Sequence, residues 1–264
     1  MKNDDPKPVI QLELIDFPKF DLVISEFAKL HQIHYNSFLG SLARSYELVE
    51  LYENLNQDTN YKSNPSLKDI LRASVVFAHG TLEEFLRQLG IKLFLESDDV
   101  VSKLRDIPLA NEKKQMRAEK FTLADLERFR GSSIDDLISK SVYDYYQRTT
   151  YNNVEDIINL LKILDISYEN IEVFLPDMAA MIRRRHEIVH KTDVVKNEET
   201  QGEKEVTEIK SSDVLRWIYA VIIFIYAILF SIATKKLVSE GKIVEPPKLE
   251  IEKVKVSIRG KRLN

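Results

Sequence analysis

The chain contains no cysteine among its 264 residues, which excludes disulfide bonds and thiolate metal sites and is typical of a reducing compartment. Glycine and proline are scarce as well, with seven and eight copies. Their scarcity favours helices, because both residues interrupt regular structure. The polar N-terminal stretch has no apolar run of the kind found in signal peptides, so we expect a cytoplasmic protein.

The chain also lacks an excess of positive charge, since its formal net charge is −4. It therefore has no overall attraction to nucleic acid, and any contact with RNA or DNA must come from a local basic patch. Hydrophobic residues make up 44% and charged residues 30%, which is ordinary for a globular protein.

Apolar residues recur at intervals of three and four over long stretches, which is typical of amphipathic helices. We expect two long helices, at residues 20–55 and from an N-cap at Ser66 to about residue 95. Shorter helices are expected from Ser132 or Ser133 to Tyr146, and from residue 154 to 164 with Asn153 as the cap. The sequence thus predicts an all-α fold.

The two ends of the chain have a different pattern from its middle. Residues 1–18 contain three prolines and are expected to be extended, whereas residues 19–236 form one helical domain. The tail at residues 237–264 includes an alternating stretch from Leu249 to Ile258, which predicts a short strand or an extended arm. The polar run from Lys196 to Ser212 is expected to be a mobile loop.

One uncharged run, from Trp217 to Thr234, is 18 residues long and lies at the lower limit for a membrane span. It can be interpreted as a membrane anchor or as a helix buried in the core. We favour the core helix because the preceding amphipathic helices need an apolar element to pack against. Membrane binding is therefore not expected.

The densest cluster of titratable and cationic residues is the segment Met181-Ile-Arg-Arg-Arg-His-Glu-Ile-Val-His190. It permits three interpretations: a solvated helix end, a zinc site, or a site that binds and transforms phosphate. The order His186-Glu187-Ile-Val-His190 satisfies the His-Glu-x-x-His pattern of zinc hydrolases. The neighbouring arginines would oppose a dication electrostatically, so no metal and no cofactor are expected.

Arginine and histidine suit phosphate chemistry better. An arginine is always charged and offers a planar fork of donors to phosphate oxygens, and a histidine can take and give a proton near neutral pH. On an ideal helix Arg185 and His190 would point roughly 140° apart, because each residue turns about 100°. Spacing alone therefore does not single out Arg185 as the partner of His190.

The string Arg185-His186-Glu187-Ile188-Val189-His190 resembles the Arg-polar-x-x-x-His signature of the HEPN superfamily, which comprises all-helical endoribonucleases and RNA-binding domains. The wider segment, continuing through Lys-Thr-Asp, is similar to stand-alone bacterial proteins of the RiboL-PSP and MAE_28990 types. Two further stretches resemble that group, at residues 82–86 and 153–166. The resemblance spans roughly residues 67–234.

The resemblance implies a HEPN-like helical bundle in which two subunits form a composite cleft. The implied reaction is metal-independent: the ribose 2′-OH attacks the adjacent phosphate and leaves a 2′,3′-cyclic phosphate. His190 would be the general acid and base, and Arg185 would stabilise charge on the phosphate. His186 would support them by orienting groups, and Glu83 would hold Arg185 or His190. The residues expected to contact RNA phosphates are Arg183, Arg184 and Lys191.

These implications describe an endoribonuclease that acts as a toxin or in antiviral defence, with RNA, a second copy of the chain and an antitoxin or defence protein as partners. The main alternative is a non-catalytic helical dimer that binds RNA or a partner protein. A zinc hydrolase and a membrane-anchored protein are less favoured.

Overall fold

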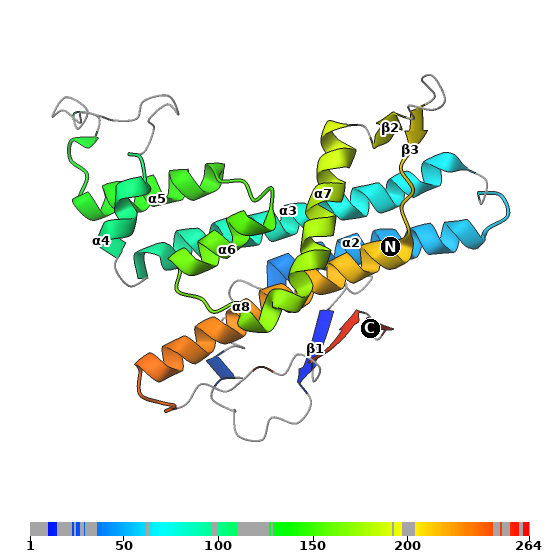
Figure 1. Cartoon of the computed structure of the whole chain (residues 1–264). Helices are drawn as coiled ribbons and strands as arrows, with labels where there is room; N and C mark the ends of the chain where they lie inside the picture. Colours follow the sequence, from blue (N-terminus) through cyan, green and yellow to red (C-terminus); the bar gives the residue numbers. More distant parts are fainter. Residues whose placement is uncertain are drawn as a thin grey trace, which may run out of the picture. The chain divides into compact units, whose positions relative to one another are not determined.

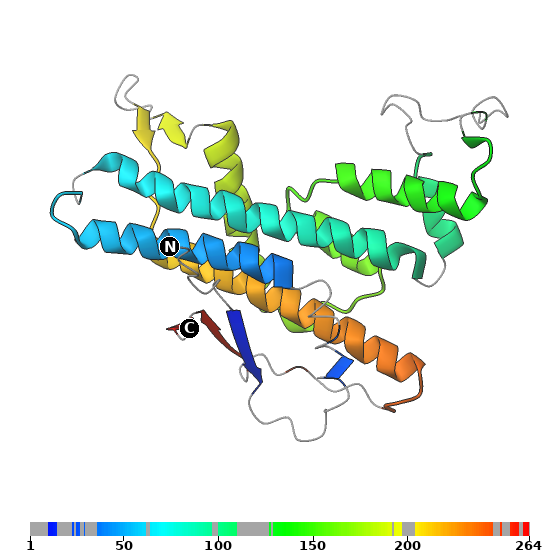
Figure 2. The same cartoon turned by 180° about the vertical axis from the view of Figure 1, so that it is seen from behind.

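We describe the protein from a computed structural model, shown from two sides in Figures 1 and 2. The residues that the structure describes are 10–14, 23, 25–26, 29, 36–61, 64–96, 100–109, 127, 129–191, 193–196, 204–244, 249, 254–258 and 261–263.

Helices make up most of the described chain, which confirms the predicted all-α class. The longer helices are α2 (Asn36–Gln57), α3 (Lys68–Leu93), α5 (Ile134–Arg148), α6 (Val154–Ile163), α7 (Leu175–His190) and α8 (Ser211–Ser239). The chain divides into two compact units. One comprises Met1–Leu82, Asn152–Val154 and Ser167–Asn264, and the other comprises Glu83–Tyr151 and Glu155–Ile166. The predicted boundaries near residues 18 and 236 stay predictions.

In the first unit, α2 and the beginning of α3 form an antiparallel pair that lies side by side in both views (Figures 1 and 2). The hydroxyl of Ser74 on α3 donates to the backbone oxygen of Ser45 on α2, at 2.7 Å. The cap before α3 is Asn64 rather than Ser66, because the Asn64 side chain accepts from the Ser66 amide and starts a 3-10 turn at Pro65–Leu67. Part of the predicted first helix, before Asn36, lies outside the described residues.

Helix α8 provides the core of the first unit and contacts both α2 and α7. Every residue from Ala220 to Phe230 is buried. Within the described residues, α8 is the one helix long and apolar enough to cross a membrane by length and composition, yet 83% of its most apolar window is buried inside the protein. This burial favours the core-helix interpretation of the uncharged run.

The second unit is built from the end of α3, the short helix α4 (Val100–Lys103), α5 and α6. Helix α5 starts at a capping box in which the Ser133 hydroxyl accepts from the Asp136 amide and donates to the Asp136 carboxylate at 2.7 Å. The predicted start at Ser133 is therefore confirmed. Gly90 on α3 faces the ring of Tyr146 on α5 so closely that a Cβ at Gly90 would lie 2.5 Å from it.

Short strands occur at both ends of the chain. Strand β1 (Ile10–Leu14) pairs antiparallel with β4 (Val254–Ile258), which pairs with β5 (Lys261–Leu263). The predicted strand in the tail is thus confirmed, and its partner is the N-terminal segment expected to be extended. Another antiparallel pair, β2 (Val194–Lys196) with β3 (Lys204–Val206), occupies part of the segment expected to be a loop, and α8 begins inside that segment at Ser211. That loop prediction was wrong for these residues.

Candidate active site on helix α7

Helix α7 carries the Arg-His-Glu-x-x-His motif and ends at its last histidine, His190. Its buried face contains Met178, Met181 and Ile182, an apolar stripe at helical spacing, and the helix contacts α8. The C-terminal end of α7 lies beside β2 and β3 in both views (Figures 1 and 2). The opposite face of the helix leaves the motif residues accessible.

The two histidines of the motif are neighbours on that accessible face. Their ring centroids are 4.8 Å apart, the planes are tilted by 46°, and both residues are exposed. Within the described part of the chain, neither imidazole forms a hydrogen bond or ion pair with another residue. Both rings can therefore meet a ligand that reaches this end of the helix.

Arg185 is half-buried and likewise forms no ion pair or hydrogen bond with another described residue. Its guanidinium is available for an anion. Arg183, in the middle of α7, and Lys191, directly after its last residue, are both exposed, and the helix dipole favours a cation at the position of Lys191. The arrangement combines proton-transfer groups with cations, which is what binding and cleaving a phosphodiester requires.

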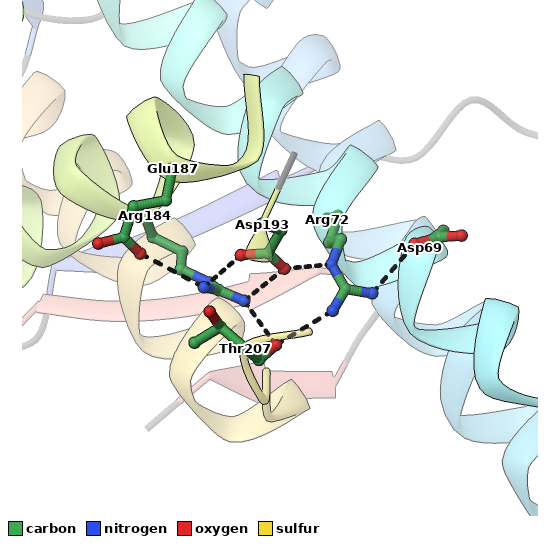
Figure 3. A network of polar contacts seen from close by, with 6 residues as sticks. All are labelled: Asp69, Arg72, Arg184, Glu187, Asp193 and Thr207. Atoms are coloured by element: carbon green, nitrogen blue, oxygen red, sulfur yellow. Dashed lines mark hydrogen bonds and ion pairs between the residues drawn. The ribbon is translucent and has the colours of Figure 1, made fainter. Parts of the chain in front are cut away.

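Arg184 has a different environment from its two neighbours. Its side chain is only 8% exposed and lies in a network of charged and polar groups (Figure 3). The guanidinium donates to Asp193 Oδ2 at 2.8 Å and to the backbone oxygen of Thr207 at 2.9 Å, and it lies 3.4 Å from Glu187 Oε2. Arg184 is therefore not placed for the RNA contact expected from the sequence, because protein acceptors already occupy it.

A second buried arginine, Arg72 of α3, completes this network (Figure 3). Its Nε donates to Asp193 Oδ2, while its terminal nitrogens donate to the Thr207 backbone oxygen at 3.1 Å and to Asp69 Oδ1 at 3.0 Å. We call Arg72, Arg184, Asp193 and the Thr207 carbonyl the arginine clamp. No role for Arg72 or Asp193 can be predicted from the sequence, since no local pattern pairs residues 121 positions apart.

Asp193 also fixes the backbone at the end of α7. Its φ of 57° lies in the left-handed region, which an aspartate tolerates better than most residues. Its amide and that of Lys191 both donate to the Glu187 backbone oxygen, at 3.1 and 3.0 Å, and its own backbone oxygen accepts from the Thr207 amide at 2.9 Å. These hydrogen bonds thus hold the last turn of α7, which carries His190, and the residues that follow it in one backbone conformation.

Glu83 lies in the second unit, and the supporting role expected of it from the sequence stays a prediction. Its carboxylate lies 3.2 Å from Arg87 Nη2 and accepts a hydrogen bond from the Tyr151 amide at 3.3 Å. Arg87 in turn donates to the Thr149 backbone oxygen at 2.9 Å. Glu83 therefore holds α3 to the segment that follows α5, within the second unit.

A zinc site would need further ligands beside the two histidines. Among the described residues, no group of three or more histidine, cysteine, aspartate or glutamate side chains is placed to hold a metal ion. Glu187, the general base of the zinc interpretation, faces Arg184 at 3.4 Å.

Comparison with known proteins identifies the family of the chain. The family model described as RiboL-PSP-HEPN matches residues 41–232, a range that includes most of α2, all of α3 and of the motif helix, and most of α8. No curated protein and no solved structure matches the chain. Because the model covers well over half of the sequence and includes the motif, the chain belongs to the RiboL-PSP-HEPN family.

Proposed function

We propose that the protein is a metal-independent endoribonuclease whose active site is the exposed end of α7. Family membership supports an RNA-related function in general. The observation that carries the finer proposal is the pair of exposed imidazoles, with ring centroids 4.8 Å apart, on the helix that also carries Arg185, whose guanidinium binds no acceptor among the described residues.

In the proposed reaction the ribose 2′-oxygen forms a bond to the adjacent phosphorus, and the bond from phosphorus to the 5′-oxygen breaks. His190 accepts the proton of the 2′-OH and returns a proton to the departing 5′-oxygen. Arg185 stabilises the additional negative charge on the phosphoryl oxygens. The products are a 2′,3′-cyclic phosphate and a 5′-hydroxyl end, which balances atoms and protons.

The remaining motif residues have supporting roles in this proposal. His186 lies against His190 and would orient it or the substrate. Arg183 and Lys191 are exposed, in the middle of α7 and directly after it, and would bind flanking phosphates. Two copies of the chain would pair through their motif helices, and the physiological role would be that of a toxin or defence nuclease in the cytoplasm, paired with an antitoxin or defence protein.

The experiment is cleavage of a labelled single-stranded RNA by the purified protein in excess EDTA, with the product ends identified. Wild type should give 2′,3′-cyclic phosphate ends, and His190→Ala should reduce cleavage by about 100-fold or more while keeping its helical circular dichroism. A matched control is Lys162→Ala, which changes an exposed residue near the end of α6. Cleavage that survives His190→Ala, or that requires an added metal, contradicts the proposal. RNA binding without cleavage would instead support the non-catalytic alternative.

A further inference from the structure

We propose that Asp193 is a positioning residue for His190, acting through the arginine clamp; this inference deepens, and rests on, the proposed ribonuclease activity. Asp193 lies three residues after His190 and outside α7, yet its carboxylate joins the motif helix to α3 (Figure 3). It touches neither of the proposed catalytic side chains. Its effect on the reaction must therefore be indirect.

The clamp holds two guanidinium groups against one carboxylate. The side chains of Arg72, Arg184 and Asp193 are 10%, 8% and 3% exposed, so two cations share one deeply buried carboxylate. The Thr207 backbone oxygen accepts a hydrogen bond from each guanidinium. Buried charges persist only when their partners are well placed, so this arrangement holds its members in one geometry.

The clamp is connected to His190 through the backbone at the end of α7. The last carbonyls of a helix normally lack intrahelical partners, so a helix end frays easily. In α7 the Glu187 carbonyl accepts from both the Lys191 and the Asp193 amides. The Glu187 carboxylate faces Arg184, which is itself bound to Asp193. His190 therefore lies in a backbone loop between Glu187, which faces Arg184 of the clamp, and Asp193, which is part of the clamp.

Holding the helix end in one geometry matters more for the position of the His190 ring than for the fold. His190 is exposed, and within the described residues no side chain anchors its imidazole by a hydrogen bond or ion pair, so the backbone at the helix end determines where the ring lies. A displacement of about 1 Å at a reacting group can reduce a rate by about 100-fold. Release of the clamp should thus lower the rate of the chemical step and leave RNA binding by exposed cations nearly unchanged.

The test compares Asp193→Asn with wild type in kcat and KM for RNA cleavage, at a temperature where both remain folded. Asparagine tolerates the left-handed backbone and keeps one acceptor oxygen, but it removes the charge that holds the two guanidiniums. We expect kcat to fall by about 10- to 100-fold and KM to change less than about twofold. Asp177→Asn is the matched control, because it breaks the ion pair with Arg216 at the other end of α7, where the two side chains are 2.7 Å apart.

A second measurement does not depend on activity. Amide hydrogen exchange at Lys191 and at residue 193 should become about tenfold faster in Asp193→Asn, with Ile182 in the middle of α7 unaffected. Arg72→Lys, which keeps the charge but loses the planar fork, should produce a smaller change of the same kind. Unchanged kcat in the folded variant, or unchanged exchange at the helix end, overturns the positioning role.

The two proposals can fail separately. If wild-type protein does not cleave RNA, the proposed function fails, and the exchange rates together with the His190 imidazole signals in NMR still decide whether Asp193 positions that ring. If wild type cleaves and Asp193→Asn cleaves equally well, the nuclease proposal stands and the positioning role is excluded.

Discussion

The three consecutive arginines of helix α7 have three different environments. Arg183 is exposed, Arg185 is half-buried, and Arg184 is buried against Asp193. The sequence indicates that one helix presents all three, but each residue turns about 100° from the last. Which of them points inward depends on acceptors at positions 193 and 207, which the local pattern does not reveal.

Different environments predict different effects of the same substitution. Arg184→Ala should lower the free energy of unfolding by about 1 to 3 kcal/mol, because the buried Asp193 carboxylate and the Thr207 backbone oxygen each lose a donor while Arg72 still pairs with Asp193. Arg183→Ala should change it by less than about 0.5 kcal/mol, since the side chain is exposed. Urea unfolding followed by circular dichroism measures both. Equal effects of the two substitutions would show that Arg184 is not held as the structure places it.

At the scale of elements, the sequence predicted most helices and one strand but not how they pair. Ser133 and its capping partner Asp136 are three residues apart, so a local signal determines where α5 starts. The pairing of β1 with β4 joins Ile10 to Ile258, and no local pattern specifies a partner that far away. Glu83 shows the same limit, because its partner Arg87 is local but its bond to the Tyr151 amide is not.

The packing of α3 on α5 gives a prediction for two glycines of one helix. Replacing an interior helix glycine with alanine usually stabilises a protein by about 0.5 to 1 kcal/mol. Gly80→Ala should follow that rule, since nothing lies within 4 Å of the added Cβ. Gly90→Ala should instead destabilise, by about 1 to 3 kcal/mol, because the added Cβ would lie 2.5 Å from the Tyr146 ring.

The unfolding midpoints of the two alanine variants, measured by thermal or urea denaturation, should move in opposite directions. A Gly90→Ala protein as stable as Gly80→Ala would show that the Tyr146 ring can move aside and that its close approach to Gly90 contributes little to the stability of the second unit.

At the scale of the whole molecule, a chain with a net charge of −4 is proposed to bind a polyanion. Such binding must depend on where the cations lie and not on their total number. Of the three consecutive arginines, Arg184 is buried in the clamp, so the cations left on the surface of this segment are the exposed Arg183 and Lys191 and the half-buried Arg185. The core helix α8 accounts for the apolar run without adding to this surface, since it is buried in the first unit.

A small local patch predicts a shallow dependence of RNA affinity on salt. In a His190→Ala background, which prevents cleavage, the logarithm of the binding constant should fall linearly with the logarithm of salt concentration, with a slope of about −0.7 for each phosphate neutralised on a single strand. Arg183→Ala should reduce the magnitude of that slope by about 0.7, because one exposed cation is lost. Arg216→Ala removes an exposed arginine that is paired with Asp177 on another face, and should leave the slope unchanged. If both substitutions changed the slope equally, overall charge would govern binding, and the end of α7 would have no special part in it.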